Sequence, residues 1–327
     1  MRIIPVIGAL IGFLIVICLT PWIIRFLKKM GLVVKDQNKE NKPLIPVSGG
    51  LVVVGGLIAG LMSYVFIQTF FYKDTSNLLI IFASTISLFL VTLIGFMDDL
   101  LIGKDREATT GLKQWQKPLL TVIGAIPLMV VNAGTSTMWI PFFGEVKFGL
   151  IYPLLFVPII FVGASNMVNM LAGFNGLETG LGLIYLGNLG LFAYVNDRMG
   201  AALIAAIAFA CLLGFFYYNK FPAKIFPGDS LTYLLGGTLA VIAIIGNIEK
   251  AALIMSIPFF IEFILKARGK FKNQSYGIYS KGKVKSLYNK IYSIPHFFTI
   301  TGKFTEGQVV YLTMLIELVF AGLVWVV

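Results

Sequence analysis

The chain has 327 residues, of which 58% are hydrophobic and 13% are charged. Soluble domains carry about 25% charged residues, so this composition excludes a soluble, disordered or fibrous protein. Lysine and arginine number 26 against 15 acidic residues, a net charge of +11. Basic chains bind nucleic acid or anionic lipid. Because the apolar content is high, we expect membrane lipids as partners and no nucleic acid, and we expect Cys18 and Cys211 to stay unpaired in their apolar runs.

Apolar runs of about 20 residues, the length that spans a bilayer, recur along the whole chain. They predict an all-α polytopic membrane protein, a single integral-membrane domain over residues 1–327 with about ten transmembrane helices. The first run is too long for the core of a signal peptide, so we expect a retained span. The runs cover residues 3–27, 49–71, 78–97, 118–132, 150–168, 179–195, 199–218, 229–247, 251–266 and 305–327.

Basic residues are divided unequally between the two sets of loops. The segments after the odd-numbered runs contain 21 lysines and arginines, Lys104 and Arg106 among them, whereas the other segments contain 5. Cytoplasmic loops of membrane proteins are enriched in these residues. We therefore expect the odd-numbered loops in the cytoplasm, both termini outside and an even number of spans. On the outer side, residues 133–149, in which Pro141 and Gly144 interrupt an aromatic stretch, are predicted to form a small interfacial hairpin.

Three groups of polar residues interrupt the apolar runs at ends predicted to be cytoplasmic, where such residues are candidates for function. The first is the pair Asp98-Asp99, followed by Lys117 at the start of the fourth run. Adjacent carboxylates repel each other unless a cation or a basic group lies near them. A solvated helix end is the alternative interpretation of the pair, and a membrane-boundary anchor is the alternative for Lys117.

The second group covers residues 165–180, which contain three asparagines and no lysine or arginine. Asn166 and Asn169 are three residues apart and would share a helix face. The Ala-Gly and Asn-Gly steps allow a sharp turn close to a ligand. A plain connection would not need this composition, so we interpret the segment as functional. The third group, FPGDS (226–230), contains Asp229, which is either a helix N-cap or a metal ligand.

Carboxylates, amide oxygens and lysines on one membrane face suit phosphoryl transfer, which depends on positioning and on charge neutralisation by Mg²⁺. The basic segment 266–304 adds Arg268, Lys270 and Lys272 for an anionic substrate. Attraction to anionic lipid is the alternative role of this segment.

These motifs resemble a known family. GFMDD (95–99), Lys117, NMVNMLAGFNGLETG (166–180) and FPGDS (226–230) are similar, in order and spacing, to the polyprenyl-phosphate N-acetylhexosamine-1-phosphate transferases. Members transfer a sugar 1-phosphate from a UDP-sugar to a lipid phosphate and release UMP. The resemblance covers nearly the whole chain and implies a ten-helix fold in the cell membrane with a cytoplasmic active site.

Within that family the chain looks closer to the dolichyl-phosphate GlcNAc-1-phosphate transferases of eukaryotes and archaea. Bacterial MraY-type enzymes typically have an aspartate in place of Ala172 and a histidine cluster in the last cytoplasmic loop, whereas this chain has one histidine, His296. The chain also lacks the long insertions of eukaryotic members. The resemblance therefore implies an archaeal enzyme that uses UDP-GlcNAc and a dolichyl phosphate.

The resemblance also implies a role for each matching residue. Asp229 and Asn169 would bind Mg²⁺, or Mn²⁺ in its place, and Lys117 would hold the pyrophosphate. Asp98 or Asp99 would orient or deprotonate the lipid phosphate. The substrate-binding residues would be Asn166, Gly173, Asn175, Glu178, Arg268 and Lys270, with Gly173 and Asn175 near the uridine.

Several alternatives stay open at this point. The donor could be another UDP-N-acetylhexosamine, the acceptor undecaprenyl phosphate, and the mechanism either direct attack or a covalent aspartyl intermediate. A homodimer is also open. Proteins of other classes, a secondary transporter or a lipid-binding scaffold, are the competing hypotheses. Transporters place ionisable residues near the bilayer midplane, where this chain has only Glu262 and Glu317, and Glu317 has no predicted partner.

Overall fold

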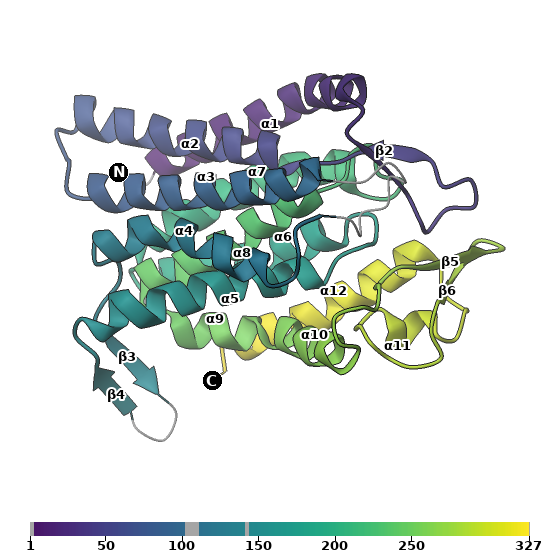
Figure 1. Cartoon of the computed structure of the whole chain (residues 1–327). Helices are drawn as coiled ribbons and strands as arrows, with labels where there is room; N and C mark the ends of the chain where they lie inside the picture. The colour runs from purple at the N-terminus through teal and green to yellow at the C-terminus, as the bar shows by residue number, and fades with distance from the viewer. Residues whose placement is uncertain (1–2, 102–110, 141–143, 327) are drawn as a thin grey trace.

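The computed structural model describes residues 3–101, 111–140 and 144–326. Long helices lie side by side and form one bundle (Figure 1). Lys104 and Arg106, which contribute to the predicted charge asymmetry, lie outside the described residues. The same holds for residues 141–143, the middle of the predicted outer hairpin.

Each predicted apolar run corresponds to one helix or to two consecutive helices. The ninth run is divided at Ser256, because Pro258 in the first turn of the following helix lacks a backbone N–H. The helices are α1 (Ile3–Met30), α2 (Gly50–Phe71), α3 (Leu78–Leu100), α4 (Gln116–Val130), the π-helical turn η1 (Tyr152–Phe156), α5 (Val157–Met170), α6 (Leu177–Val195), α7 (Met199–Asn219), α8 (Gly228–Gly246), α9 (Glu249–Met255), α10 (Ile257–Arg268), α11 (His296–Thr299) and α12 (Glu306–Leu323).

Length and hydropathy identify the helices that can cross a membrane. In the described residues, seven are long and apolar enough, and α4 is apolar but shorter. The seven are Ile4–Lys29, Gly50–Phe71, Leu78–Leu100, Tyr152–Met170, Met199–Asn219, Gly228–Gly246 and Glu306–Leu323. The protein is therefore a mostly helical, multi-pass membrane protein, as the composition predicts.

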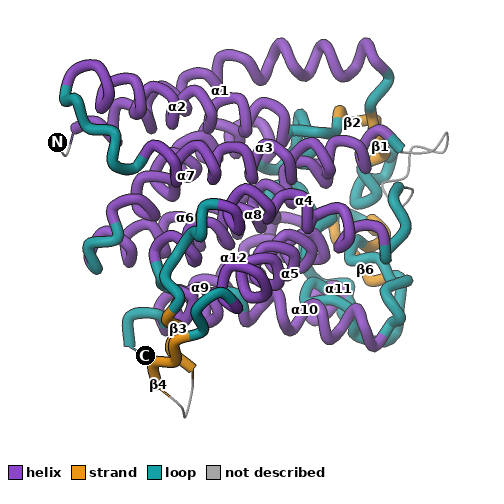
Figure 2. Tube along the Cα trace, turned by 60° about the vertical axis from the view of Figure 1, so that its left-hand side comes forward, coloured by secondary structure: helices purple, strands orange, loops and turns teal. Residues whose placement is uncertain are grey.

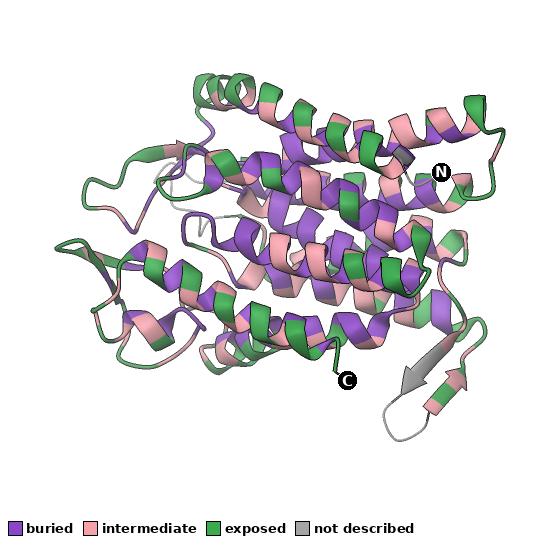
Figure 3. Ribbon diagram, turned by 180° about the vertical axis from the view of Figure 1, so that it is seen from behind, coloured by how far each residue is buried: buried purple, intermediate pink, exposed green. Residues whose placement is uncertain are grey.

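Burial separates the helices of the interior from those of the periphery. α8 is the central helix, with 83% of its apolar window buried, against 22% for α1. α8 packs against α3, α5 and α7, and its Tyr233 side chain is fully buried. Peripheral helices instead expose apolar side chains outward, such as Val6 and Leu10 of α1, and this exposed outer layer surrounds a buried interior (Figure 3). The exposed apolar surface is the surface that would contact lipid tails.

Three short antiparallel hairpins lie at the ends of the bundle. Among them, the hairpin predicted within residues 133–149 is confirmed as β3 (Thr137–Ile140) and β4 (Gly144–Lys147). The other two, which the sequence did not predict, are β1 (Val33–Lys35) with β2 (Leu44–Pro46) and β5 (Gly277–Ser280) with β6 (Lys283–Ser286).

The two ends of the bundle differ in what they carry. The β3–β4 hairpin and both chain termini lie at one end, and the other two hairpins and α11 lie at the opposite end (Figures 1 and 2). The segments predicted to be cytoplasmic therefore gather at a single end of the bundle.

Candidate active site

The C-terminal end of α3 contacts the first turn of α8 so closely that no side chain fits between them. A Cβ added at Gly95 would lie 2.3 Å from the carbonyl oxygen of Asp229. Asp99 is buried at this junction and accepts hydrogen bonds from the backbone N–H groups of Asp229 (2.7 Å) and Ser230 (3.3 Å) and from the Ser48 hydroxyl (2.8 Å). These are free N–H groups of a helix start, which favour a negative charge. Asp99 thus anchors α3 to α8.

Asp98, the other member of the pair, contacts a lysine instead. The Lys117 Nζ lies 2.5 Å from Asp98 Oδ2 and 2.8 Å from Asp229 Oδ2. The Asp98 side chain is 3% exposed, whereas those of Lys117 and Asp229 are 24% and 27% exposed. The Lys117 and Asp229 side chains are therefore partly exposed at the site, whereas Asp98 contacts the Lys117 ammonium from the buried side.

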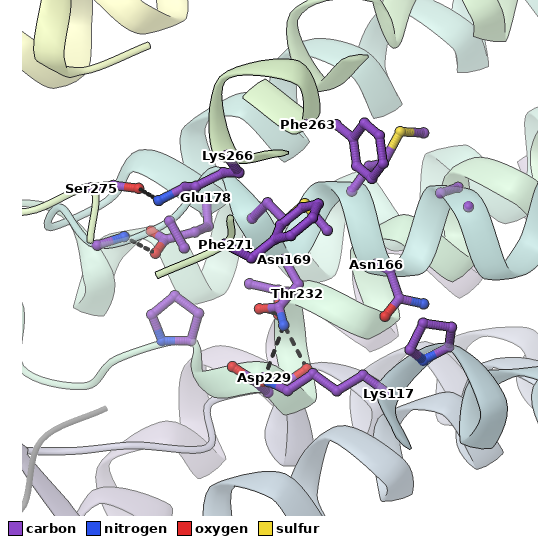
Figure 4. Close-up of a pocket in the computed structure, with 18 of the residues that line it drawn as sticks. Lys117, Asn166, Asn169, Glu178, Asp229, Thr232, Phe263, Lys266, Phe271 and Ser275 are labelled. Atoms are coloured by element: carbon purple, nitrogen blue, oxygen red, sulfur yellow. Dashed lines mark hydrogen bonds and ion pairs between the residues drawn. The ribbon is translucent and has the colours of Figure 1, made fainter. Parts of the chain in front are cut away.

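Two asparagines of α5 line the same side, as their spacing predicts. Asn169 donates from Nδ2 to Asp229 Oδ2 (3.0 Å) and accepts at Oδ1 from the Thr232 hydroxyl (2.8 Å). Asn166 donates to Thr121 Oγ1 (3.0 Å). Figure 4 shows Lys117, Asn169 and Thr232 converging on Asp229.

The charges of this centre fit a divalent cation. Asp98, Asp99 and Asp229 carry three negative charges when ionised, and Lys117 neutralises one of them. Mg²⁺ is typically held by one or two carboxylates together with waters and substrate phosphates. Asp229 can serve as that carboxylate, and the Asn169 amide would offer its oxygen after turning away from Thr232. Within the described residues no three or more Asp, Glu, His or Cys side chains cluster as metal ligands.

A cavity of about 1160 Å³ opens in front of Asp229. Its polar end is lined by five residues described above and by two more, Glu178 and Lys266; the five are Lys117, Asn166, Asn169, Asp229 and Thr232. Its other walls are mostly apolar and come from η1, α5, α8, α9 and α10, where Glu249 and Ser256 also line the cavity. They include Phe156, Ile159, Ile160, Met167, Leu239, Ala243, Leu253, Phe260 and Phe263. The cavity can therefore hold a ligand, or a pair of ligands, with one charged and one apolar part.

The loop between α5 and α6 forms one wall of the polar end. Asn175 is 3% exposed. Its Nδ2 donates to Asp36 (3.0 Å) and to Glu306 (2.6 Å), and its Oδ1 accepts from the Ala223 N–H (2.7 Å). Although Asn175 borders the cavity, its polar atoms bind the protein. Its amide therefore holds the loop in place.

Gly173 and Glu178 also line the cavity in this wall. Gly173 adopts a φ of +116° and lines the cavity. Its N–H donates to Glu178 Oε1 (2.9 Å), while Glu178 Oε2 is buried without a hydrogen-bond partner among the described residues. A buried acceptor without a partner is costly, and a ligand that donates a hydrogen bond would remove that cost.

A basic residue of α10 lines the cavity, in place of the Arg268 and Lys270 that the sequence predicts. Lys266 lines the cavity and donates to the Asn273 carbonyl (2.8 Å) and to Ser275 Oγ (2.7 Å). The structure does not bring Arg268 or Lys270 there. Both are exposed, and Arg268 lies 5.8 Å from the centre of the Tyr292 ring. In the sequence, Lys266 could have been recognised by its position four residues after Glu262, which places both side chains on one face of a helix. In the structure their charged atoms lie 3.7 Å apart.

His296 binds the backbone of the last loop at two points. Its Nδ1 accepts from the Tyr292 N–H (3.2 Å), and its Nε2 lies 3.0 Å from the Gln274 carbonyl, to which it donates in the neutral form. Burial, helped by the charge of Lys266, lowers the pKa of His296 to about 4. The one histidine of the chain is therefore a neutral structural residue in the loop that closes the cavity.

The comparisons with known proteins agree with this site. Residues 78–247 match the model of a family described as glycosyl transferase family 4. The chain belongs to this family. The matched range of this family 4 protein contains Asp98, Lys117, Asn169 and Asp229, and the resemblance drawn from its motifs is confirmed.

Named relatives cover nearly the whole chain. A protein of Saccharolobus solfataricus is 36% identical over 95% of this chain and 93% of its own length, and one of Sulfolobus acidocaldarius is 31% identical over 96% and 93%. Both carry the provisional name UDP-N-acetylglucosamine–dolichyl-phosphate N-acetylglucosaminephosphotransferase. A phospho-N-acetylmuramoyl-pentapeptide-transferase of Lactiplantibacillus plantarum is 35% identical over 77% of this family 4 chain and 78% of its own.

Proposed function

We propose that the protein is a phosphotransferase that moves GlcNAc-1-phosphate from UDP-GlcNAc to a polyprenyl phosphate of the dolichyl type and releases UMP. The observation that carries this proposal is one continuous cavity, which joins the charged Lys117–Asp229 centre to apolar walls between α5, α8 and α10. A water-soluble nucleotide sugar and a lipid phosphate can meet in such a space. The names of the two archaeal relatives support the choice of sugar and lipid.

The reaction follows from this arrangement. An oxygen of the lipid phosphate attacks the β-phosphorus of the donor, and the bond from that phosphorus to the oxygen shared with UMP breaks. Phosphoryl transfer of this kind depends on bringing anions together and neutralising their charge. Lys117 supplies a fixed positive charge at the meeting point, and Asp98 holds its ammonium in place. Asp99, committed to backbone N–H groups of α8, keeps Asp229 at the same point.

We propose Mg²⁺, or Mn²⁺ in its place, as the cofactor, held by Asp229 and Asn169. The excess negative charge around Lys117 supports this assignment. When bound, the ion would neutralise pyrophosphate charge as a Lewis acid. The protein's own residues hold that position, because Lys117 and Asn169 orient the Asp229 carboxylate from two sides.

We also propose an orientation in the cell membrane. The end of the bundle with β1–β2 and β5–β6 faces the cytoplasm, the chain crosses ten times, and both termini are outside. The distribution of 21 basic residues against 5 supports this orientation. The donor, made in the cytoplasm in this proposal, then reaches the charged centre without crossing the bilayer.

An assay of UMP release tests the proposal. Purified protein is incubated with Mg²⁺, dolichyl phosphate and one donor at a time: UDP-GlcNAc, UDP-GalNAc or UDP-MurNAc-pentapeptide. We expect UMP and lipid-linked GlcNAc from UDP-GlcNAc, and neither product from a matched Lys117→Met variant. Preference for the muramyl-peptide donor, the substrate class named for the Lactiplantibacillus relative, would reject the choice of sugar. Absence of UMP with every donor would reject the reaction.

A further inference from the structure

The loop between β1 and β2 lines the polar end of the cavity, although the sequence predicted no functional motif in it. Asp36 and Gln37 line the cavity, and Asn38 follows directly with 2% of its surface exposed. A buried polar side chain in an exposed hairpin loop needs partners within the protein. The partners of Asn38 lie in two distant parts of the chain.

Asn38 connects the two loops that border the polar end. Its Nδ2 donates to the Gly173 carbonyl (2.8 Å) in the loop between α5 and α6, and its Oδ1 accepts from the Gly277 N–H (3.1 Å) in the last loop. The neutral amide makes this pair of bonds with one planar group, because one partner is an acceptor and the other a donor, whereas an ionised carboxylate has no donor to offer. Gly173 itself lines the cavity, as do Ser275 and Tyr276 immediately before Gly277.

Each of the two loops also has its own attachment. Glu178 binds the Gly173 N–H on the opposite side of the same peptide segment. Lys266 holds the last loop at Asn273 and Ser275. These bonds fix each loop to its own helix, whereas Asn38 fixes one loop to the other. The two loops also lie against each other, since a Cβ added at Gly173 would be 3.6 Å from the Tyr276 backbone nitrogen. Asn38 binds both loops at this contact and so fixes their relative position.

We propose that Asn38 is a positioning residue that fixes the Gly173 loop relative to the last loop, and so the fit of the nucleotide part of the donor. The proposal rests on the proposed function, because it assumes that a nucleotide sugar occupies this end. Asn38 does not take part in the charged centre, so its loss should weaken donor binding more than lipid binding.

The test uses three variants of the full-length protein. Asn38→Ala removes both bonds. Asn38→Asp keeps the acceptor for the Gly277 N–H but turns a negative oxygen toward the Gly173 carbonyl. Protonation of the introduced carboxyl restores a donor, so the defect should shrink as the pH falls. Asn41→Asp is the matched control, with the same change in an exposed residue of the same loop.

Three measurements decide the matter: KM for UDP-GlcNAc, KM for dolichyl phosphate, and inhibition by UMP. We expect Asn38→Ala, and Asn38→Asp at pH 8, to raise the donor KM and the UMP inhibition constant by about tenfold, with the lipid KM within about twofold of wild type. Between pH 8 and pH 5.5, the activity of Asn38→Asp relative to wild type should recover, while that of Asn41→Asp should stay constant.

Two results would overturn the proposal: an unchanged donor KM in Asn38→Ala, or an Asn38→Asp defect that shows no recovery at low pH in a protein that elutes as wild type does on gel filtration. Failure of the proposed function looks different, because the wild-type protein would then release no UMP. In that event UMP binding to wild type and to Asn38→Ala, measured by calorimetry, still tests the role of Asn38. Equal affinities would reject it.

Discussion

The two neighbouring aspartates at the end of α3 have different partners, and we therefore expect them to have different roles. Asp99 accepts hydrogen bonds from two backbone N–H groups of α8 and from Ser48. Asp98 pairs with Lys117, which in turn contacts Asp229. Only Lys117 and Asp229 of these residues line the cavity. The carboxylate that anchors α3 to α8 and the carboxylate that lines the cavity can therefore be separated by mutation.

Substitution of Asp99 should affect stability first. In Asp99→Asn the amide group replaces one oxygen and points an N–H donor at the N–H donors of α8. We expect the free energy of unfolding to fall by about 1–3 kcal/mol, the usual cost of an unpaired buried polar group. Thermal unfolding in detergent measures this loss. A thermal midpoint equal to that of wild type would contradict the anchoring role.

Substitution of Asp229 should affect turnover first. Asp229→Asn removes a negative charge from the open side of the site, where the cation is proposed to bind. We expect the rate of UMP release to fall by about 100-fold or more, because charge stabilisation at a metal is worth several kcal/mol. The thermal midpoint should change little. Near-normal turnover at saturating Mg²⁺ would reject Asp229 as a ligand.

At the scale of elements, the last loop is where the sequence was least informative. Nine lysines and arginines between residues 266 and 303 look alike in the sequence, yet only Lys266 of the described ones lines the cavity. What distinguishes it is the burial of α10 on the face that carries Glu262. That face is set by packing between distant helices, which a local pattern does not contain.

A paired substitution on α10 tests this assignment. Lys266→Met removes both bonds to the last loop, and we expect kcat/KM for UDP-GlcNAc to fall by about tenfold, equivalent to about 1.4 kcal/mol. Arg268→Met, two residues along the same helix but exposed, should cost about threefold or less. A larger loss for Arg268→Met would mean that its guanidinium reaches the donor after binding, as the family resemblance implies.

The pH dependence of stability should reveal the buried histidine of the same loop. The pKa of His296 is about 4 in the folded protein and 6.5 ordinarily. Between these values the unfolded chain binds a proton that the folded chain does not, so stability falls as the pH decreases from 6.5 to 4. Thermal midpoints of wild type and His296→Gln across this window measure the effect. The variant should show the shallower decline, and parallel curves would contradict the assignment.

At the scale of the whole molecule, the hydropathy of the sequence predicted more of the fold than any motif did. All ten apolar runs are helices or helix pairs, because about 20 apolar residues can satisfy their backbone in a membrane only as a helix. The β1–β2 and β5–β6 hairpins escaped prediction, since strands of three and four residues are too short to show alternation. The three acidic and amide motifs were placed correctly at one end of the bundle. The direction of each side chain, as with Asn175, required the structure.

Orientation in the membrane can be tested with single cysteines. Cys18 and Cys211 are replaced, and one cysteine is introduced at Lys283 in β6 or at Lys147 in β4. Both positions are exposed and lie at opposite ends of the bundle. In intact cells an impermeant maleimide should label the Lys147 position, and the Lys283 position only after lysis. Labelling of the Lys283 position in intact cells would reverse the proposed orientation.

The anchoring of α8 by Asp99 places the charged centre and the β1–β2 and last loops in different parts of the chain. Asp98, Lys117 and Asp229 are held on their helices by contacts with one another. All three fall within residues 78–247, the range of the family model. Asn38 and the last loop fall outside that range. A lineage could therefore exchange its β1–β2 loop or its last loop and acquire a new donor, while the reacting centre stayed as it was. Relatives named for GlcNAc transfer and for muramyl-peptide transfer differ in the donor that their names give, as such an exchange of loops would lead us to expect.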